Sequence, residues 1–423
     1  MIILVLIISH LIFWVNLTTS QKVTTNNNPC GQLYLTQSPK KSKNLQINWH
    51  FTCENLPDTL LLTLGDLRVN PNAQILYQIN PGSVIKGFQA TQIPFKNVEF
   101  PGNWTVDNDY PDLKAKCFDY YISSRRNKEI IYSQCFSIQP AWMSNFGDLR
   151  IGEMMIPGTH NSGAWQTKLP GFKNYVLNQD KNFWEQLVYG IRYFDIRIGR
   201  YGNPPQGFYI NHDFVKCTEL VPELQSVANF LKKSPNEVVV LNFHRFVQPR
   251  DFLEGYHLEL LRVVRDIFGD LIYPYSRFMH PKGPKLREFW QSQKRVIISY
   301  RQDYFVRRNP WLWPGVQREW GNVQKLQNLE NYVKTKISKP VRGNPLNALM
   351  AELTPNYRNF LQYVNTNLKD LALMVNQELS DWVIENNRSD NLNIIATDYF
   401  TGNDMINVAI DTNFRKLQRS FFY

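Results

Sequence analysis

A regular alternation of short apolar runs and amphipathic stretches fills the chain from about residue 142 to its end at Tyr423. The apolar runs have the length and composition of buried strands, and the stretches between them have the apolar spacing of helices. Strands that alternate with helices over roughly 280 residues predict a parallel sheet covered by helices. This length favours a closed but distorted (β/α) barrel of the TIM type over an open sheet.

The pattern also locates most elements of this α/β barrel. The expected strands are 154–156, 191–198, 207–213, 237–243, 294–300, 348–353 and 391–398. The expected helices are 182–189, 221–233, 251–268, 364–385 and a last helix from about Met405. The barrel is therefore expected to occupy residues 142–423, after the boundary marked by Pro140-Ala-Trp142.

The front of the chain has a different pattern. Short alternating apolar runs separated by turn residues lie at 45–53, 59–64, 74–79, 98–100 and 105–106. This spacing predicts a smaller all-β, sandwich-like domain over residues 21–141, with a loose polar start over 21–44. The front shows no cluster of catalytic residue types, so its function is not predicted beyond a possible protein partner.

The first 17 residues form an apolar run of signal-peptide length, followed by Thr18-Thr-Ser20. This pattern predicts a signal peptide over residues 1–20 and a secreted, extracellular protein, with an uncleaved anchor as the alternative. In that pathway Asn103 and Asn387 would be glycosylation sites, since each begins an Asn-X-Ser/Thr sequence.

Five cysteines fit a secreted chain. Cys117 and Cys135 flank an expected hairpin and are predicted to form a disulfide across it. Cys30 and Cys53 are then paired by elimination. Cys217 stands apart from this set and is expected to be a buried free thiol.

Polar and titratable side chains follow the expected strands at their carboxyl ends. In chain order they are His160, Asn161, Asp195, Arg197, His212, Asp213, His244, Arg245, Arg301, Glu352 and Asp398. Because the carboxyl ends of parallel strands meet at one face, these side chains predict one shared site. Two imidazoles and several guanidinium groups suit phosphoryl transfer. One ring takes a proton from an attacking hydroxyl, another gives one to the leaving oxygen, and a guanidinium holds the phosphate.

Three of these segments resemble the X region of phosphatidylinositol-specific phospholipases C, most closely the X-domain-only and bacterial types. The segments are Pro157-Gly-Thr-His160, Gly190-Ile-Arg-Tyr-Phe-Asp195-Ile-Arg197 and the later His212. The resemblance covers about residues 145–415 and leaves out the β-rich front. Pro-Gly-Thr-His alone is a weak motif, whereas the ordered set is specific.

The resemblance implies a catalytic role for five residues. His160 matches the general base that deprotonates the inositol 2-hydroxyl, and His212 matches the acid that protonates the diacylglycerol oxygen. Arg197 matches the arginine that neutralises the phosphate in metal-independent members, and Asp195 matches its acidic neighbour. Asp398 matches the carboxylate that orients the base.

Five further residues are expected to bind the substrate. Arg301 and Glu352 match residues that hold inositol hydroxyls, and Asn161, His244 and Arg245 complete the set. Purely structural roles remain the alternative for Arg301, Glu352 and His244. Asp213 is expected to be structural.

No cofactor is expected. Arg197 stands where the calcium-dependent branch has an acid that binds the ion, and a guanidinium would repel a cation. Bacterial members carry Asp directly after the base, whereas this chain has Asn161, which cannot raise the pKa of a nearby histidine by charge. Turnover should therefore be lower in this chain than in the bacterial members. Calcium-dependent relatives use Asn at this position as a ligand, so weak calcium binding is the alternative.

The resulting prediction is a secreted phosphoric diester hydrolase of the phospholipase C type. It would cleave an inositol phospholipid or a glycosylphosphatidylinositol anchor at a membrane surface to a cyclic inositol phosphate. The net charge of +11 agrees with an anionic surface. Charge alone does not exclude nucleic acid, but the site residues favour a lipid substrate, and no nucleic-acid partner is expected. The first alternative is a weak or inactive X-domain protein that binds phosphorylated head groups or a protein. The second is a metal-dependent phosphodiesterase, for which the sequence shows no carboxylate cluster near His160.

A basic, aromatic segment, 307–314, follows one expected barrel strand and contains Trp311 and Trp313. Tryptophan together with arginine suits a lipid interface. A loop packed against the protein is the alternative.

Overall fold

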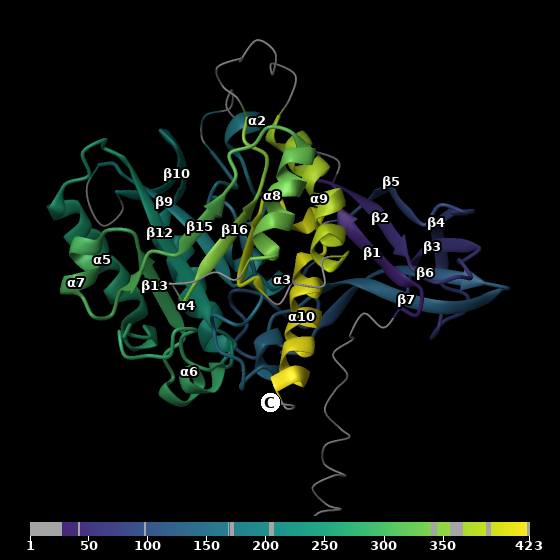
Figure 1. Cartoon of the computed structure of the whole chain (residues 1–423), viewed down its shortest axis with the longest axis horizontal. Coiled ribbons are helices and arrows are strands. Elements are labelled where there is room, and N and C mark those ends of the chain that lie inside the picture. Colours follow the sequence, from purple (N-terminus) through teal and green to yellow (C-terminus); the bar gives the residue numbers. More distant parts are fainter. Residues whose placement is uncertain are drawn as a thin grey trace, which may run out of the picture.

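The computed structural model describes residues 28–40, 43–96, 99–167, 169, 173–202, 207–339, 345–355, 367–385 and 391–420. The predicted signal peptide and Asn387 lie outside these residues. In the described part, none of the helices combines the length and apolar character needed to cross a bilayer. Figure 1 shows a β-rich part beside a larger α/β part. We call them the β region (residues 28–138) and the barrel region (residues 142–420).

The β region consists of two antiparallel sheets that share one apolar core, which includes Leu33, Ile47, Leu62 and Phe118. The first sheet has the order β1 (Gly31–Gln37), β2 (Asn44–Phe51), β5 (Lys86–Pro94). The second has the order β4 (Gln74–Ile79), β3 (Thr59–Leu64), β6 (Lys116–Arg126), β7 (Glu129–Ile138). The predicted all-β class of this region agrees with these sheets.

Two expectations for the β region were wrong. Residues 21–44 are not loose throughout, because β1 pairs with β2 along its full length. The segments 99–100 and 105–106 are not strands; this stretch instead carries Phe100 and Trp104, which pack on the barrel region. Their ring centroids lie 5.3 Å from Tyr189 and 5.7 Å from Phe230, respectively. Burial of these rings against the neighbouring region has taken precedence over strand pairing.

The cysteine predictions are confirmed. Disulfides join Cys30 to Cys53 and Cys117 to Cys135, and the second of these connects β6 to β7. Cys217 is a buried free thiol. Two disulfides are compatible with a secreted chain.

The barrel region is built on a curled parallel sheet. Its strands are β8 (Ile156–Thr159), β9 (Tyr193–Arg200), β12 (Val239–Gln248), β13 (Val296–Tyr300), β14 (Trp313–Pro314), β15 (Gln317–Trp320), β16 (Asn347–Ala351) and β17 (Ile394–Thr397). They are hydrogen-bonded in the order β14-β13-β12-β9-β8-β17-β16-β15, and every pair is parallel. The two ends of this order, β14 and β15, belong to one continuous segment. The sheet therefore curls back on itself as a distorted barrel, as predicted.

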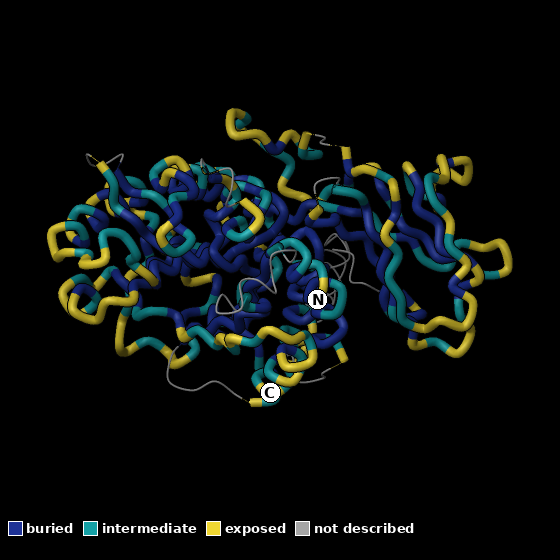
Figure 2. The backbone as a smooth tube through the Cα atoms, turned by 90° about the horizontal axis from the view of Figure 1, so that it is seen from above, coloured by how far each residue is buried: buried dark blue, intermediate teal, exposed yellow. Residues whose placement is uncertain are grey.

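Helices cover the outside of the sheet. They are α2 (Lys173–Val176), α3 (Phe183–Tyr189), α4 (Leu220–Lys233), α5 (Glu254–Phe268), α6 (Leu286–Ser292), α7 (Asp303–Arg308), α8 (Leu326–Ile337), α9 (Leu368–Glu385) and α10 (Met405–Ser420). Local sequence sets their ends: Asn182 and Glu185 form a capping box at the start of α3, and Gly190, with φ 131°, ends it. In Figure 2 the buried backbone gathers toward the interior of the molecule and the exposed segments lie at its edge.

Two predicted strands of the barrel differ from the structure. The first begins at Ile156 and runs through Pro157-Gly158, so His160 directly follows its last residue. The third, β10 (Phe208–His212), is not a parallel barrel strand. It pairs antiparallel with β9 and forms a hairpin with β11 (Val215–Glu219). Because β10 runs back along β9, it returns His212 to the rim of the barrel.

The two regions pack closely against each other. The Tyr189 ring contacts Phe118 and Phe136 of the β region, with centroids 6.1 Å apart in both pairs. Helix α9 lies between the barrel strands and the β region (Figure 1), where Asp381 pairs with Lys86 at 2.9 Å. His50 Nδ1 lies 3.4 Å from the same carboxylate. The β region is thus joined to the barrel by aromatic packing and by ion pairs.

The segment 307–314 is packed, so the lipid-interface prediction for it was wrong. Trp313 is buried and its indole N–H donates to the Tyr273 carbonyl at 2.9 Å. Trp311 is half-buried and packs on the apolar core, with Arg265 over its ring. Apolar packing of both rings accounts for the segment.

Candidate active site

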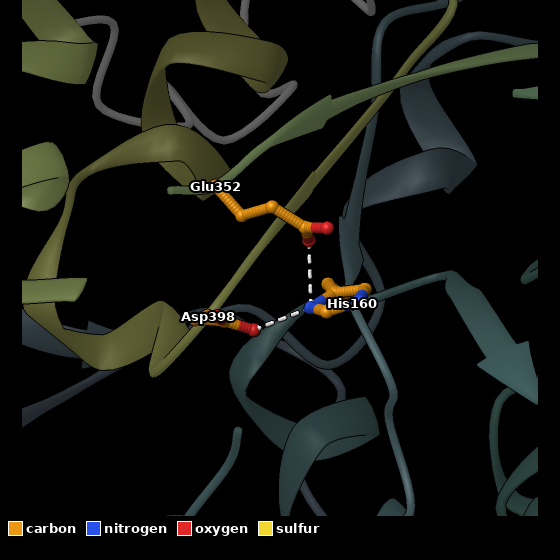
Figure 3. A group of neighbouring side chains, drawn as sticks. All are labelled: His160, Glu352 and Asp398. Atoms are coloured by element: carbon orange, nitrogen blue, oxygen red, sulfur yellow. Dashed lines mark hydrogen bonds and ion pairs between the residues drawn. The ribbon is translucent and has the colours of Figure 1, made fainter. Parts of the chain in front are cut away.

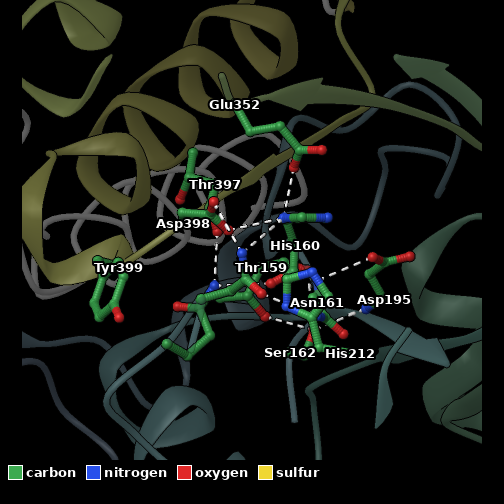
Figure 4. Close-up of polar contacts among 12 residues, drawn as sticks. Thr159, His160, Asn161, Ser162, Asp195, His212, Glu352, Thr397, Asp398 and Tyr399 are labelled. Carbon is green, nitrogen blue, oxygen red and sulfur yellow. Dashed lines mark hydrogen bonds and ion pairs between the residues drawn. The ribbon is translucent and has the colours of Figure 1, made fainter. Parts of the chain in front are cut away.

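A pocket of about 740 Å³ opens at the carboxyl ends of the barrel strands. Eight of the ten predicted site residues line it: His160, Arg197, His212, His244, Arg245, Arg301, Glu352 and Asp398. The other two, Asn161 and Asp195, are fully buried and lie among the residues that support the pocket. Figure 4 shows the polar contacts that join several of these side chains.

Two carboxylates face one nitrogen of the His160 ring (Figure 3). Nδ1 lies 2.8 Å from Asp398 Oδ1 and 2.6 Å from Glu352 Oε2. His160 directly follows β8, Asp398 directly follows β17, and Glu352 directly follows β16. Since these strands are neighbours in the sheet, their ends place the three side chains together. The hydrogen on Nδ1 is thereby held toward the carboxylates.

The other ring nitrogen of His160 is covered by Arg197. Nη2 of the guanidinium lies 2.6 Å from Nε2. A guanidinium is only a donor, so this contact requires an unprotonated Nε2 and therefore a neutral ring. The carboxylates favour the charged ring instead. Burial lowers the pKa of His160, but Glu352 and Asp398 outweigh burial and raise this pKa to about 9. The geometry fixes the neutral ring in this arrangement, and the raised pKa makes that ring a strong base once Nε2 is uncovered.

A chain of amides supports the acid partner of His160. Asn178 Nδ2 donates to Asp398 Oδ2 at 3.1 Å, and Asn161 Nδ2 donates to Asn178 Oδ1 at 2.9 Å. Asn161 has φ 44°, a conformation that Asn tolerates better than most residues, and its backbone N–H donates to Asp195 Oδ2. Its side chain therefore points into the protein and is not placed for direct contact with a substrate.

Asp195 is the buried counter-ion of the site. Its carboxylate lies 2.7 Å from His244 Nδ1, 3.5 Å from Arg318 Nε and 3.7 Å from Arg197 Nη2. Burial opposes its ionisation, but Arg318, His244 and Arg197 hold the pKa of Asp195 well below its usual range. The ionised carboxylate thus orients two guanidinium groups and one ring.

Arg318 is a pocket residue that the sequence analysis missed. It lies on β15, a four-residue strand without the apolar run that identified the other strands. The alternation of Val316, Arg318 and Trp320 was the available signal. Asn178, which precedes α3 and also lines the pocket, carried no comparable signal.

His212 is neutral in this arrangement. Its Nδ1 lies 2.7 Å from the Val176 carbonyl oxygen, which can only accept, so Nδ1 carries the proton. Burial, followed by the charge of Arg197, lowers the pKa of His212 to about 4. The ring is close enough to Arg197 and His160 for both to contribute to this shift. A negative charge placed beside Arg197 would oppose it.

Two further arginines line the outer part of the pocket. Arg245 is exposed and pairs with Asp213 at 2.8 Å. Arg301 is exposed, and among the described residues its guanidinium has no hydrogen bond or ion pair. With Arg197 and Arg318, these residues give the pocket a cationic wall that suits an anionic ligand.

His160, Glu352 and Asp398 could in principle hold a metal ion, since their ligand atoms lie within 4.8 Å of one another. The two acids come from strands that are distant from His160 in the sequence, so the sequence alone shows no carboxylate cluster near it. The donor set does not fit calcium, which prefers oxygen ligands. The short Nδ1–oxygen distances match a protonated Nδ1, and Arg197 lies against the same ring. Asp195, the acidic neighbour of Arg197, is already surrounded by cations.

About two thirds of the chain has the fold of phosphatidylinositol-specific phospholipases C. A variant of the Staphylococcus aureus enzyme superposes with a TM-score of 0.53 at 19% identity, over 65% of this chain and 97% of that chain. The Listeria monocytogenes enzyme superposes with a TM-score of 0.50 at 16% identity, over 65% of this chain and 98% of that one. Identities this low show the shared fold alone.

Proteins that are similar in sequence define the class of this protein more narrowly than the shared fold does. Human PI-PLC X domain-containing protein 1 is 28% identical over 315 residues, which are 66% of this chain and 94% of the human protein. Mouse PI-PLC X domain-containing protein 2 is 27% identical, over 57% of this chain and 70% of that protein. Zebrafish PI-PLC X domain-containing protein 3 is 23% identical, over 69% and 96%, respectively. No family model matches the chain. The chain is thus a homologue of the PI-PLC X domain-containing proteins, which confirms the resemblance predicted from its motifs.

Proposed function

We propose that this chain is a metal-independent phosphodiesterase of the phospholipase C type that cleaves an inositol phospholipid. The observation that supports this most strongly is the His160 ring, which has two carboxylates on one nitrogen and the Arg197 guanidinium on the other. This arrangement unites a strong base with a phosphate-binding cation in one cationic pocket. The same residues match the family motifs in order and spacing.

In the proposed reaction the substrate phosphate draws Arg197 away from Nε2 of His160. Nε2 then takes the proton of the inositol 2-hydroxyl, and the resulting imidazolium is stabilised by Glu352 and Asp398. The 2-oxygen attacks the phosphorus, and the bond from phosphorus to the diacylglycerol oxygen breaks. His212 supplies the proton to that oxygen, and the products are a cyclic inositol phosphate and diacylglycerol. Arg197 stabilises the charge on the phosphoryl oxygens throughout.

His212 needs its substrate to act as an acid. With a pKa lowered to about 4, its ring carries no proton on Nε2 near neutral pH in the free protein. The bound phosphate would lessen the effect of Arg197 and raise the pKa of His212. This dependence on the substrate, together with Asn161 in place of Asp, agrees with slow turnover.

The experiment is phosphorus NMR of phosphatidylinositol incubated with the protein, with and without EDTA. The proposal expects a cyclic inositol phosphate signal that EDTA does not change and that His160→Ala abolishes. Loss of the signal with EDTA would favour a metal ion on His160, Glu352 and Asp398 and would contradict the metal-independent mechanism.

A second candidate function is binding without turnover, and the neutral state of His212 is the observation that favours it. The cationic wall would then hold a phosphorylated head group. Retention of inositol phosphates by a protein that releases no product from phosphatidylinositol or from a glycosylphosphatidylinositol anchor would support this candidate. The anchor is included as substrate because the predicted secretion would place the protein among anchored surface proteins.

A further inference from the structure

Asn178 is a buried amide that contacts the carboxylate of Asp398. It precedes α3, lines the pocket and is only 1% exposed. Its Nδ2 donates to Asp398 Oδ2 at 3.1 Å, and its Oδ1 accepts from Asn161 Nδ2 at 2.9 Å. Its backbone N–H donates to the Ala164 carbonyl at 2.9 Å, and its carbonyl accepts from the Tyr399 N–H at 2.8 Å. Both backbone groups and both ends of the amide thus have partners, so Asn178 is fixed in place.

Of the two carboxylates beside His160 Nδ1, Asp398 is the one that forms a hydrogen bond. Asp398 Oδ1 lies 2.8 Å from this nitrogen in hydrogen-bond geometry. Glu352 Oε2 lies closer, at 2.6 Å, but it has no hydrogen bond among the described residues and acts as a neighbouring charge. The Asp398 carboxylate can rotate about its bond to Cβ, and Asn178 holds its second oxygen. This contact keeps the first oxygen in line with the ring.

The next residue, Gln179, holds the main chain around the same pair. Its Nε2 donates to the carbonyl oxygens of His160 at 2.9 Å and Thr397 at 2.8 Å. Thr397 ends β17 and directly precedes Asp398. Asn178 and Gln179 therefore fix the carboxylate side chain and the ends of β8 and β17 together.

The hydrogen bonds between these amides and the carboxylate run in one direction. A carboxylate only accepts, so Asp398 requires the N–H end of the Asn178 amide. The C=O end of Asn178 then faces Asn161, which must donate. Asn161 Oδ1 has no hydrogen bond within the described ranges, so this donation is the contact that its side chain supplies. A carboxylate at position 161 could not supply it.

We propose that Asn178 is a positioning residue, which holds the Asp398 carboxylate in line with the His160 ring, and that Asn161 sets the orientation of Asn178. The inference rests on the proposed function for its effect on turnover, whereas the hydrogen bond itself can be observed without turnover. Asn161→Asp separates it from an effect of charge. A charge that strengthens the acid would speed turnover. The hydrogen-bond chain predicts slower turnover, because the new carboxylate attracts the N–H end of Asn178 away from Asp398.

An equally buried amide at the opposite end of the same strand provides a matched control. Asn393 is 1% exposed and directly precedes β17, whereas Asp398 directly follows it. Its Nδ2 donates to the carbonyl oxygens of Ile151 and Met154, both at 2.9 Å. Asn393→Ala removes hydrogen bonds of the same kind and should lower stability without an effect on the His160 ring.

The first measurement is proton NMR of the full chain without lipid. A hydrogen shared between an imidazole and a carboxylate is in a charge-assisted hydrogen bond and resonates at lower field than backbone amide protons. Its loss in His160→Ala identifies the resonance. Asn178→Ala and Asn161→Asp should shift it or lose it by exchange with solvent, because the Asp398 carboxylate is then free to rotate. Asn393→Ala should leave it unchanged.

The second measurement is turnover of a monomeric, short-chain phosphatidylinositol. Asn178→Ala should lower kcat by about 10–10²-fold, part of the roughly 10²–10⁴-fold that a general base contributes. KM should stay within about twofold, because Asn178 acts through Asp398 and does not bind the phosphate. Asn161→Asp should also lower kcat, and Asn393→Ala should not.

Thermal unfolding would show that each variant is folded, and the isosteric Asn161→Asp carries the test if Asn178→Ala does not fold. The inference is overturned if the wild type lacks the low-field resonance, if Asn178→Ala keeps the resonance or the kcat of the wild type, or if Asn161→Asp turns over faster. A changed resonance with lower kcat supports both the inference and the proposed function. A changed resonance in a protein whose wild type cleaves no inositol lipid supports the positioning by Asn178 and contradicts the proposed function.

Discussion

Arg197 Nη2 lies 2.6 Å from Nε2 of His160 and covers the nitrogen that would accept a substrate proton. In the free protein the guanidinium thus occupies the position that the attacking hydroxyl must approach. Binding of a phosphate would take up the guanidinium and expose the base at the same time. Arg197 would therefore couple the arrival of substrate to the availability of His160.

Replacement of Arg197 should separate these two effects. Arg197→Met is expected to lower kcat by about 10²–10³-fold, because the developing charge on the phosphate loses its fixed cation. Arg197→Lys should retain more activity but bind phosphate less well, since an ammonium cannot form the paired contact. Steady-state kinetics with and without calcium would measure both. The assigned role would be contradicted if Arg197→Met kept the kcat of the wild type, or if calcium restored the activity of this variant.

The carboxylates should shift the pH profile in a predictable direction. Glu352 and Asp398 raise the pKa of His160 to about 9, and a base works only when unprotonated. For the free enzyme, kcat/KM should rise with pH up to about 9. Glu352→Gln removes one negative charge, so the rising limb should move to lower pH. A limb that stays in place would show that Glu352 does not act on the base. Arg245→Gln, on the outer part of the pocket, is the matched control and should leave the limb unchanged.

Buried histidines should make the protein less stable in mild acid. Burial lowers the pKa of His212, His244 and His257 to about 4 in the folded state, below the ordinary value of 6.5. Between pH 6.5 and 4 the unfolded chain therefore binds more protons, and the free energy of unfolding should fall as the pH falls. His257 lies outside the pocket among aromatic rings. His257→Phe should reduce the slope of stability against pH over this range in denaturant titrations. An unchanged slope would contradict the assignment.

The ion pair between the two regions should contribute measurably to the free energy of unfolding. Lys86 Nζ lies 2.9 Å from the nearly buried Asp381 and 2.8 Å from Glu378. Lys86→Met leaves a buried carboxylate whose remaining cationic neighbour among the described residues is His50, and should cost about 1–3 kcal/mol. Lys40→Met removes a more exposed pair at 3.9 Å from Asp370 and should cost less than about 0.5 kcal/mol. Equal costs for the two variants would show that the Asp381 pair does not hold the regions together.

Much of the barrel could be predicted because its strands are buried on both sides. Such strands are continuous apolar runs, and residues at their carboxyl ends converge whatever the loops between them do. For this reason His160, Glu352 and Asp398 could be assigned to one site although more than 230 positions separate the first from the last. Strand periodicity alone could not give direction, so β10 was placed parallel when it runs antiparallel to β9.

The remaining differences come from packing that local patterns do not encode. Arg318 was missed because β15 is short and half-exposed, and only closure of the sheet brings its side chain to Asp195. Trp311 and Trp313 were candidates for a lipid surface because their segment is basic, yet the core buries Trp313.

The central claim is that His160 initiates cleavage of an inositol phosphodiester without a metal ion. Phosphorus NMR of phosphatidylinositol with the wild type and with His160→Ala, each with EDTA, tests it most directly. The account predicts a cyclic inositol phosphate from the wild type in the presence of EDTA and none from the variant. The same product from His160→Ala, or no product from the wild type, would contradict it.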